Sequence, residues 1–138
     1  TSPGRHGARV GSGGLPGAPI EGPVLQVAAA KASVAPDRLV PLIDRLQSRI
    51  DERATRLARR YETAYEDDGV TAYFVDETFW ADLGAAADLD PRETDAVRRA
   101  HNEQLLYAGR RLGRREEFES ALEIRECVHV HATDGDSS

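Results

Sequence analysis

Cysteine occurs only once in this chain of 138 residues, as Cys127. A single thiol excludes an internal disulfide and any metal site made of cysteine alone within one chain, and it is typical of a reducing compartment. Aromatic residues are also scarce, at 6% of the sequence, so the apolar area available per residue is modest. We therefore expect the fold to rely on close helix packing or on a partner chain.

Lysine is as rare as cysteine, since Lys31 is the only lysine among 18 basic residues. Arginine in place of lysine, together with a formal net charge of −6, is typical of a cytoplasm of high ionic strength. The acidic balance disfavours nonspecific binding to nucleic acid or to an anionic membrane. Residues 1–65 hold ten basic and six acidic side chains (net +4), whereas residues 66–138 hold eight and eighteen (net −10). The two halves should therefore attract each other.

Long apolar runs are absent too. No segment reaches the roughly 18 apolar residues of a membrane span, and the basic N-terminal stretch lacks the apolar block of a signal peptide. We therefore expect a cytoplasmic protein. Residues 1–23 contain seven glycines and four prolines without apolar periodicity, which predicts a disordered tail. The rest of the chain predicts a single α+β domain at residues 24–132 and an acidic tail at residues 133–138.

The first half of the predicted domain has the apolar spacing of two helices. Val24–Val34 predicts the first, and a longer pattern from about Pro36 to about Tyr65 predicts the second. Arginines recur along one flank of the second helix, where they could contact a partner helix. A solvated arginine face explains them equally well. These candidate interaction residues are Arg45, Arg49, Arg53, Arg56 and Arg60.

A turn and a strand follow the long helical pattern. Asp67–Gly69 predicts the turn, and Val70–Val75, rich in β-branched and aromatic residues, predicts a central and largely buried strand. A metal site in the acidic turn is disfavoured because the ligand spacing of a calcium loop is missing. After the strand, Asp76 is expected to cap a short helix that extends to about Asp88.

The clearest helix start in the sequence is Asp90–Glu93. It combines an N-cap residue, a proline at the first helical position and a glutamate that can reach back to the cap. The helix is expected to end near Gly113. His101 and Gln104 fall on its inner, apolar face and are candidate buried polar residues. A hydrogen-bonded core histidine is the commoner interpretation than a catalytic one.

The last segment, Leu122–His131, alternates between apolar and polar residues and predicts a half-buried strand that pairs with Val70–Val75. On such a strand three metal-ligand types share one face, and zinc would need a fourth ligand from elsewhere. The spacing does not match a zinc finger, so we expect no cofactor and keep zinc as an alternative. The candidate ligands are Cys127, His129 and His131.

The expected fold is therefore α+β, with four main helices packed on a two-stranded β-sheet in the order ααβααβ. One more helical turn is expected near Arg114–Ser120, ahead of the last strand.

Three stretches carry a resemblance to a known family. They are YEDDGVTAYFVD at Tyr65–Asp76, DLDPRETDAVRRAHNEQ at Asp88–Gln104 and EFESALEIRE at Glu117–Glu126. From Val24 to about His131 the chain resembles a small family of uncharacterised haloarchaeal proteins, a domain of unknown function. The resemblance implies a cytoplasmic archaeal protein, and it transfers no active site to this chain.

The sequence favours no enzyme, because no nucleophile with its base, acid–base pair or cofactor loop is recognisable. We expect a small non-enzymatic interaction or assembly module, forming a homodimer or binding another protein. The competing hypothesis is a nucleic-acid-associated regulator that uses the arginine stripe. A metal-binding protein is a third possibility.

Overall fold

The computed structural model describes residues 19–131 of the chain. Residues 1–18 and 132–138, to which most of the two predicted tails belong, lie outside the described residues. Residues 19–23 belong to the folded part, because Ile20 is buried in the core and the first described helix begins at Gly22. The tail boundary expected at residue 23 is therefore placed too late.

The first two helices confirm the predicted helix–corner–helix arrangement. α2 (Gly22–Ala32) ends at Ser33, whose φ of 58° reverses the chain direction. α3 (Pro36–Glu52) begins with a proline, which fits a first helical position because its missing N–H has no partner there in any case. α2 packs along the later helix α6 (Pro91–Leu112).

The single long helix expected up to Tyr65 is wrong. The helix breaks at Arg53, continues as the short α4 (Ala54–Arg60) and gives way to a strand, β1 (Thr63–Asp67). Helical spacing of apolar residues extends through this segment, but pairing of β1 with the next strand decides its conformation, since tertiary contacts override local propensity.

The predicted turn at Asp67–Gly69 exists, but it closes a β-hairpin rather than ending a helix. Asp68 and Gly69 have φ angles of 53° and 80°, the pair of positive values that a tight hairpin turn requires. Asp67 and Val70 face each other across it.

The sheet has three strands rather than the expected two. The predicted pairing is confirmed: β2 (Val70–Val75) is central and lies antiparallel to β3 (Glu126–His131), with Tyr73 opposite Val128. β1 adds to the other side of β2, so the strand order is β1-β2-β3. With six helices and three strands among residues 19–131, the α+β class holds and the order ααβααβ does not.

The helices after the hairpin are α5 (Phe79–Ala86), α6 and α7 (Arg115–Leu122). The capping box at the start of α6 is present, with Glu93 N donating to Asp90 Oδ1 at 2.8 Å and Asp90 N donating to Glu93 Oε1 at 3.0 Å. At α5 the N-cap residue is Thr78 instead of Asp76. The Asp76 carboxylate accepts hydrogen bonds from the backbone and hydroxyl of Thr78.

The last strand is shorter and more buried than expected. α7 continues to Leu122, Ile124 is 81% exposed in the connecting loop, and β3 begins only at Glu126. Residues 127–130 are all buried, so the strand has no solvent-facing side. Helices cover both faces of the sheet at this point, which removes the simple alternation.

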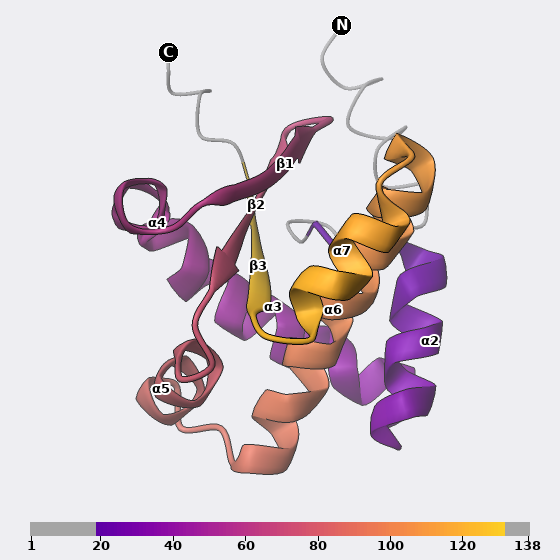
Figure 1. The fold of residues 1–138 in the computed structure, drawn as a ribbon. Coiled ribbons are helices and arrows are strands. Elements are labelled where there is room, and N and C mark those ends of the chain that lie inside the picture. The colour runs from indigo at the N-terminus through magenta and orange to yellow at the C-terminus, as the bar shows by residue number, and fades with distance from the viewer. Residues whose placement is uncertain (1–18, 132–138) are drawn as a thin grey trace, which may run out of the picture.

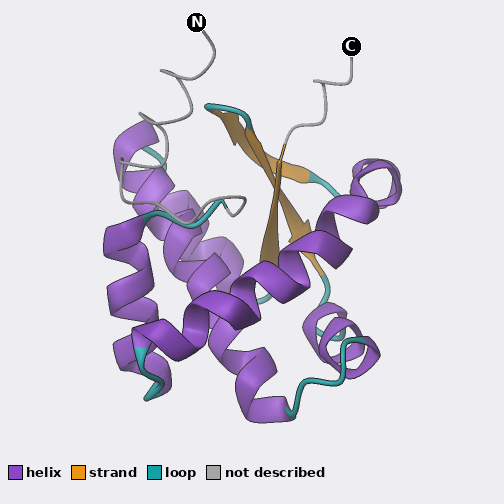
Figure 2. Cartoon of the chain, turned by 180° about the vertical axis from the view of Figure 1, so that it is seen from behind, coloured by secondary structure: helices purple, strands orange, loops and turns teal. Residues whose placement is uncertain are grey.

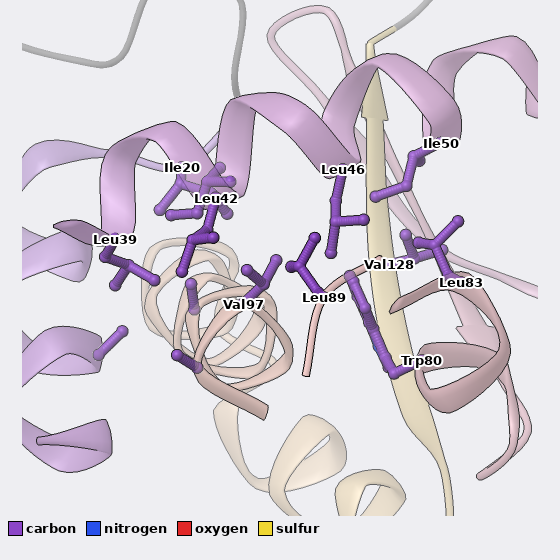
Figure 3. Close-up of a cluster of buried hydrophobic side chains, with 14 of the residues drawn as sticks. Ile20, Leu39, Leu42, Leu46, Ile50, Trp80, Leu83, Leu89, Val97 and Val128 are labelled. Atoms are coloured by element: carbon purple, nitrogen blue, oxygen red, sulfur yellow. The ribbon is translucent and has the colours of Figure 1, made fainter. Parts of the chain in front are cut away.

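Two apolar clusters lie on the two faces of the sheet. One joins Val75, Val128 and Val130 to α3, α5 and α6, and Figure 3 shows side chains of α3 directed toward Trp80 and Val128. The other packs Phe118 of α7 and neighbouring α6 residues on the opposite face. Figure 1 shows the twisted sheet between these helices, and in the opposite view of Figure 2 α3 crosses in front of the sheet. No helix among residues 19–131 is long and apolar enough to cross a membrane.

Candidate functional site

The three candidate metal ligands lie on β3, but each contacts a residue of a neighbouring helix, His101 or Asp51. Cys127 Sγ is 3.3 Å from the carbonyl oxygen of His101, His129 Nδ1 is 3.4 Å from His101 Nδ1, and His131 Nδ1 is 3.0 Å from Asp51 Oδ2. Within residues 19–131 no group of three or more histidine, cysteine or acidic side chains is arranged to hold a metal.

The outer edge of β3 is instead hydrogen-bonded to side chains from three helices. We call it the capped edge, and it consists of the outward backbone groups of residues 127, 129 and 131 with their partners. Its four bonds run from Trp80 Nε1 to Cys127 O (3.1 Å), from His129 N to His101 Nδ1 (3.0 Å), from Gln47 Nε2 to His129 O (2.9 Å) and from His131 N to Asp51 Oδ1 (3.2 Å).

The capped edge requires a neutral His101. Because His101 Nδ1 accepts the amide hydrogen of His129, the ring proton must be on Nε2. Both rings are fully buried. Burial lowers the pKa of His101 well below its ordinary value, with a further contribution from His129, and lowers the pKa of His129 to about 3. Both imidazoles are therefore uncharged at neutral pH.

The single thiol is equally unreactive. Cys127 is fully buried, and burial, followed by the nearby charge of Glu126, raises the pKa of its thiol well above the ordinary value. A thiol held protonated is a poor nucleophile and a poor metal ligand. The thiol and the buried histidine of β3 are therefore core residues.

Gln104, the second candidate buried polar residue, connects α6 to the start of α2. Its Oε1 accepts from Glu21 N and its Nε2 donates to Glu21 Oε2, both at 2.9 Å. Arg111 bridges Glu21 to Asp67 of the hairpin, at 3.2 and 2.9 Å. This network fixes three segments relative to one another, so Gln104 has a structural partner.

The arginine stripe does not form one continuous surface. The break at Arg53 divides it between two helices. Arg45 donates to the carbonyl of Ala87 at 2.8 Å and Arg53 to that of Arg49 at 2.9 Å. Within the described part of the chain, Arg49 and Arg56 form no ion pair with a carboxylate.

An open groove of about 830 Å³ lies between α4 and the β1–β2 hairpin. We call it the charged groove. Arg59 on α4 lines one side, and the acidic turn lines the other, while Tyr73 and Val130 of the sheet lie between them. The remaining lining residues are Ala54, Thr55, Ala58, Glu66, Gly69, Val70, Thr71 and His131.

Asp51 and His131 connect the groove to the capped edge. The Asp51 carboxylate accepts from His131 and from Gln47, whose Nε2 is 3.0 Å from Oδ1. Partial burial opposes ionisation of Asp51, but these hydrogen bonds outweigh it and hold the pKa of its carboxyl below the ordinary value. Asp51 thus fixes the ring of His131, a residue that lines the groove, through Nδ1.

Sequence reasoning missed Gln47, Trp80 and Asp51 as partners of β3, and it missed the groove altogether. Gln47 gives a usable signal, since it interrupts the apolar stripe of α3 between Leu46 and Ile50. A polar residue on a buried stripe predicts a buried hydrogen-bond partner.

Comparison with known proteins gives one match. The family model described as "Domain of unknown function (DUF8048)" matches residues 18–132. No curated protein and no solved structure matches the chain.

Proposed function

The chain belongs to this family of unknown function, and we propose that its domain is a small, non-enzymatic protein-interaction or assembly module. Its partner binds in the charged groove. The observation that carries the proposal is a contrast in exposure between the polar side chains around β3 and those that line the groove. His101, His129 and Cys127 are buried, whereas the groove is open and lined by Arg59 and an acidic turn. Exposed charges of this kind give a surface specificity for a partner with complementary charge.

The setting predicted from the sequence belongs to the same proposal. We propose a cytoplasmic protein of haloarchaeal origin that acts as a homodimer or binds another protein. The excess of acidic residues and the near-complete use of arginine for lysine support this setting.

The competing function is binding to nucleic acid through the arginine stripe. The exposed Arg56, which has no carboxylate partner in the described region, favours it. The net charge of −6 and the backbone bonds of Arg45 and Arg53 oppose it. In a gel-shift titration at low salt, a nucleic-acid binder retains DNA with an affinity that falls as salt rises, whereas an interaction module does not retain it.

A site-specific cross-linker tests the interaction module. We suggest p-benzoylphenylalanine in place of Thr55, which is exposed in the groove, and in place of Ala85, which is exposed on α5 outside it. Irradiation of the full chain in cells should give protein adducts at Thr55 and few at Ala85. The Arg59→Glu substitution should diminish the adducts at Thr55. Equal yields at the two positions, or none at Thr55, would contradict the proposal.

A further inference from the structure

The groove has a basic side with unused charges. Arg56 and Arg59 are exposed on α4 and, within residues 19–131, have no carboxylate within ion-pair distance. Arg60 has only a long contact of 3.9 Å with Asp76. Of these three arginines of α4, Arg59 is the one that lines the groove, and it is unpaired within the described chain.

The opposite side has acidic residues that are similarly available. Glu66 and Asp68 are exposed and form no ion pair among the described residues, whereas Asp67 is held by Arg111 at 2.9 Å. The positive φ angles of Asp68 and Gly69 define a tight turn. The acidic side chains are thus presented from a fixed backbone.

These opposite charges form no ion pair with each other among the described residues. α4 and the turn lie at opposite ends of the five-residue strand β1, which spans roughly 13 Å between its first and last residues at about 3.3 Å per residue. Figure 1 shows α4 near one end of β1 and the turn at the other. A two-fold axis reverses this direction, so it brings the basic end of one copy to the acidic end of the other.

The surface between the two ends permits close approach. Small residues flank the charges on both sides of the groove, with Ala54, Thr55 and Ala58 on α4 and Gly69 in the turn, which leaves room for side chains of a partner. Two symmetric sets of charge pairs would then form around a shallow contact, and complementary charge gives such a contact its specificity.

Resting on the proposed function, we infer that the partner is a second copy of this chain, docked across a two-fold axis with α4 of each copy against the hairpin turn of the other. Each contact is made twice, so one substitution alters the dimer at two places.

Light scattering coupled to size-exclusion chromatography of the full chain tests this arrangement. The unchanged protein should elute as a dimer. Arg59→Glu and Asp68→Arg should each weaken dimerisation by about ten-fold or more, because like charges then face each other at two contacts. The double variant Arg59→Glu/Asp68→Arg should recover the dimer. Arg92→Glu, an exposed charge reversal on α6 outside the groove, should leave it unchanged.

A second pair, Arg59→Glu and Glu66→Arg, repeats the exchange with two groove residues if Asp68→Arg does not fold, as judged by circular dichroism. A monomer at the highest soluble concentration overturns the inference, as does a double variant as weak as its parents. Monomeric protein whose Thr55 probe still cross-links to other proteins refutes only the self-partner. Monomeric protein without groove adducts refutes the proposed function as well.

Discussion

The outer edge of β3 and the charged groove belong to the same three-stranded sheet, yet their polar groups are in opposite situations. At the capped edge, backbone groups of Cys127 and His129 are bonded to neutral side chains of Trp80, His101 and Gln47. In the groove, charged side chains such as Arg59 lie open to solvent. The capped edge uses mainly buried neutral hydrogen bonds, with the partly buried Asp51 carboxylate as its one ionised partner, whereas the groove keeps exposed charges.

This difference separates stability from association. A free edge strand is a template for pairing with another chain, and side chains that occupy its N–H and C=O groups prevent this. Exposed charges contribute little to folding, because surface ion pairs are worth about 0 to 1 kcal/mol, but they can select a partner. Substitutions at the capped edge should therefore change the free energy of unfolding, and substitutions in the groove should change the oligomeric state.

The largest loss of stability is expected for His101→Leu. It leaves the buried N–H of His129 without an acceptor and disturbs the packing of the ring on Trp80, whose centroid is 4.8 Å away. We expect the free energy of unfolding to fall by about 2 to 4 kcal/mol in urea titrations.

His101→Asn is the matched variant for this prediction. The amide oxygen of asparagine stands near the position of Nδ1, so the acceptor is restored although volume is lost. If the leucine variant, with more of the volume retained, is as stable as the asparagine variant or more stable, the capping bond is not what His101 contributes.

The second prediction concerns pH. The imidazoles of His101 and His129 stay neutral in the folded protein, but in the unfolded protein they bind protons below their ordinary pKa of 6.5. Below that pH the unfolded state therefore binds more protons than the folded state, and acid favours unfolding. The stability from this pair is thus complete above that pH and is lost as the pH falls toward the folded value of about 3 for His129. Between about pH 7.5 and 5.5, two such groups cost about 2 to 3 kcal/mol.

Urea unfolding at several pH values measures this loss, and nuclear magnetic resonance checks its cause. The carbon-bound ring protons of His101 and His129 should keep their chemical shifts over the same pH range. A titration of either ring near pH 6.5 in the folded protein would show that the capped edge tolerates a charged imidazole.

The third prediction addresses Gln47, whose amide donates to His129 O. Gln47→Met keeps the length of the side chain and removes Nε2, which donates to both His129 O and Asp51 Oδ1, but it also removes Oε1, which has no partner in the described part of the chain. The two effects oppose each other, so the expected loss is about 1 to 2 kcal/mol. Gln26→Met, on the exposed side of α2, is the control and should change stability by less than about 0.5 kcal/mol.

The sequence predicts those parts of the fold whose signals are local. The capping box at Asp90 and the strand Val70–Val75 follow from residue types at fixed spacing, and the structure has both. The pairing of β2 with β3 could also be predicted, because two buried strands require a neighbour.

The parts that failed depend on contacts between distant segments. β1 has helical spacing of apolar residues and becomes a strand only because the Asp68–Gly69 turn returns the chain to β2. The capped edge joins Gln47 to His129 across 82 positions of sequence. His101 on the inner face of α6 was identifiable as a candidate, but its acceptor role required the position of β3. The groove lies between α4 and the β1–β2 hairpin, and no local sequence pattern predicts that these two segments face each other.

The smallest effect is expected at Ile124, just before the capped strand. The sequence places this residue in a half-buried strand, but its side chain is 81% exposed and lies outside β3. Ile124→Thr should therefore change the free energy of unfolding by less than about 0.5 kcal/mol. Val128→Thr adds the same hydroxyl to a fully buried position and should cost about 1 to 3 kcal/mol. Equal losses at the two positions would mean that the side chain of Ile124 is packed as closely as that of Val128, and that the buried part of this segment begins before Glu126.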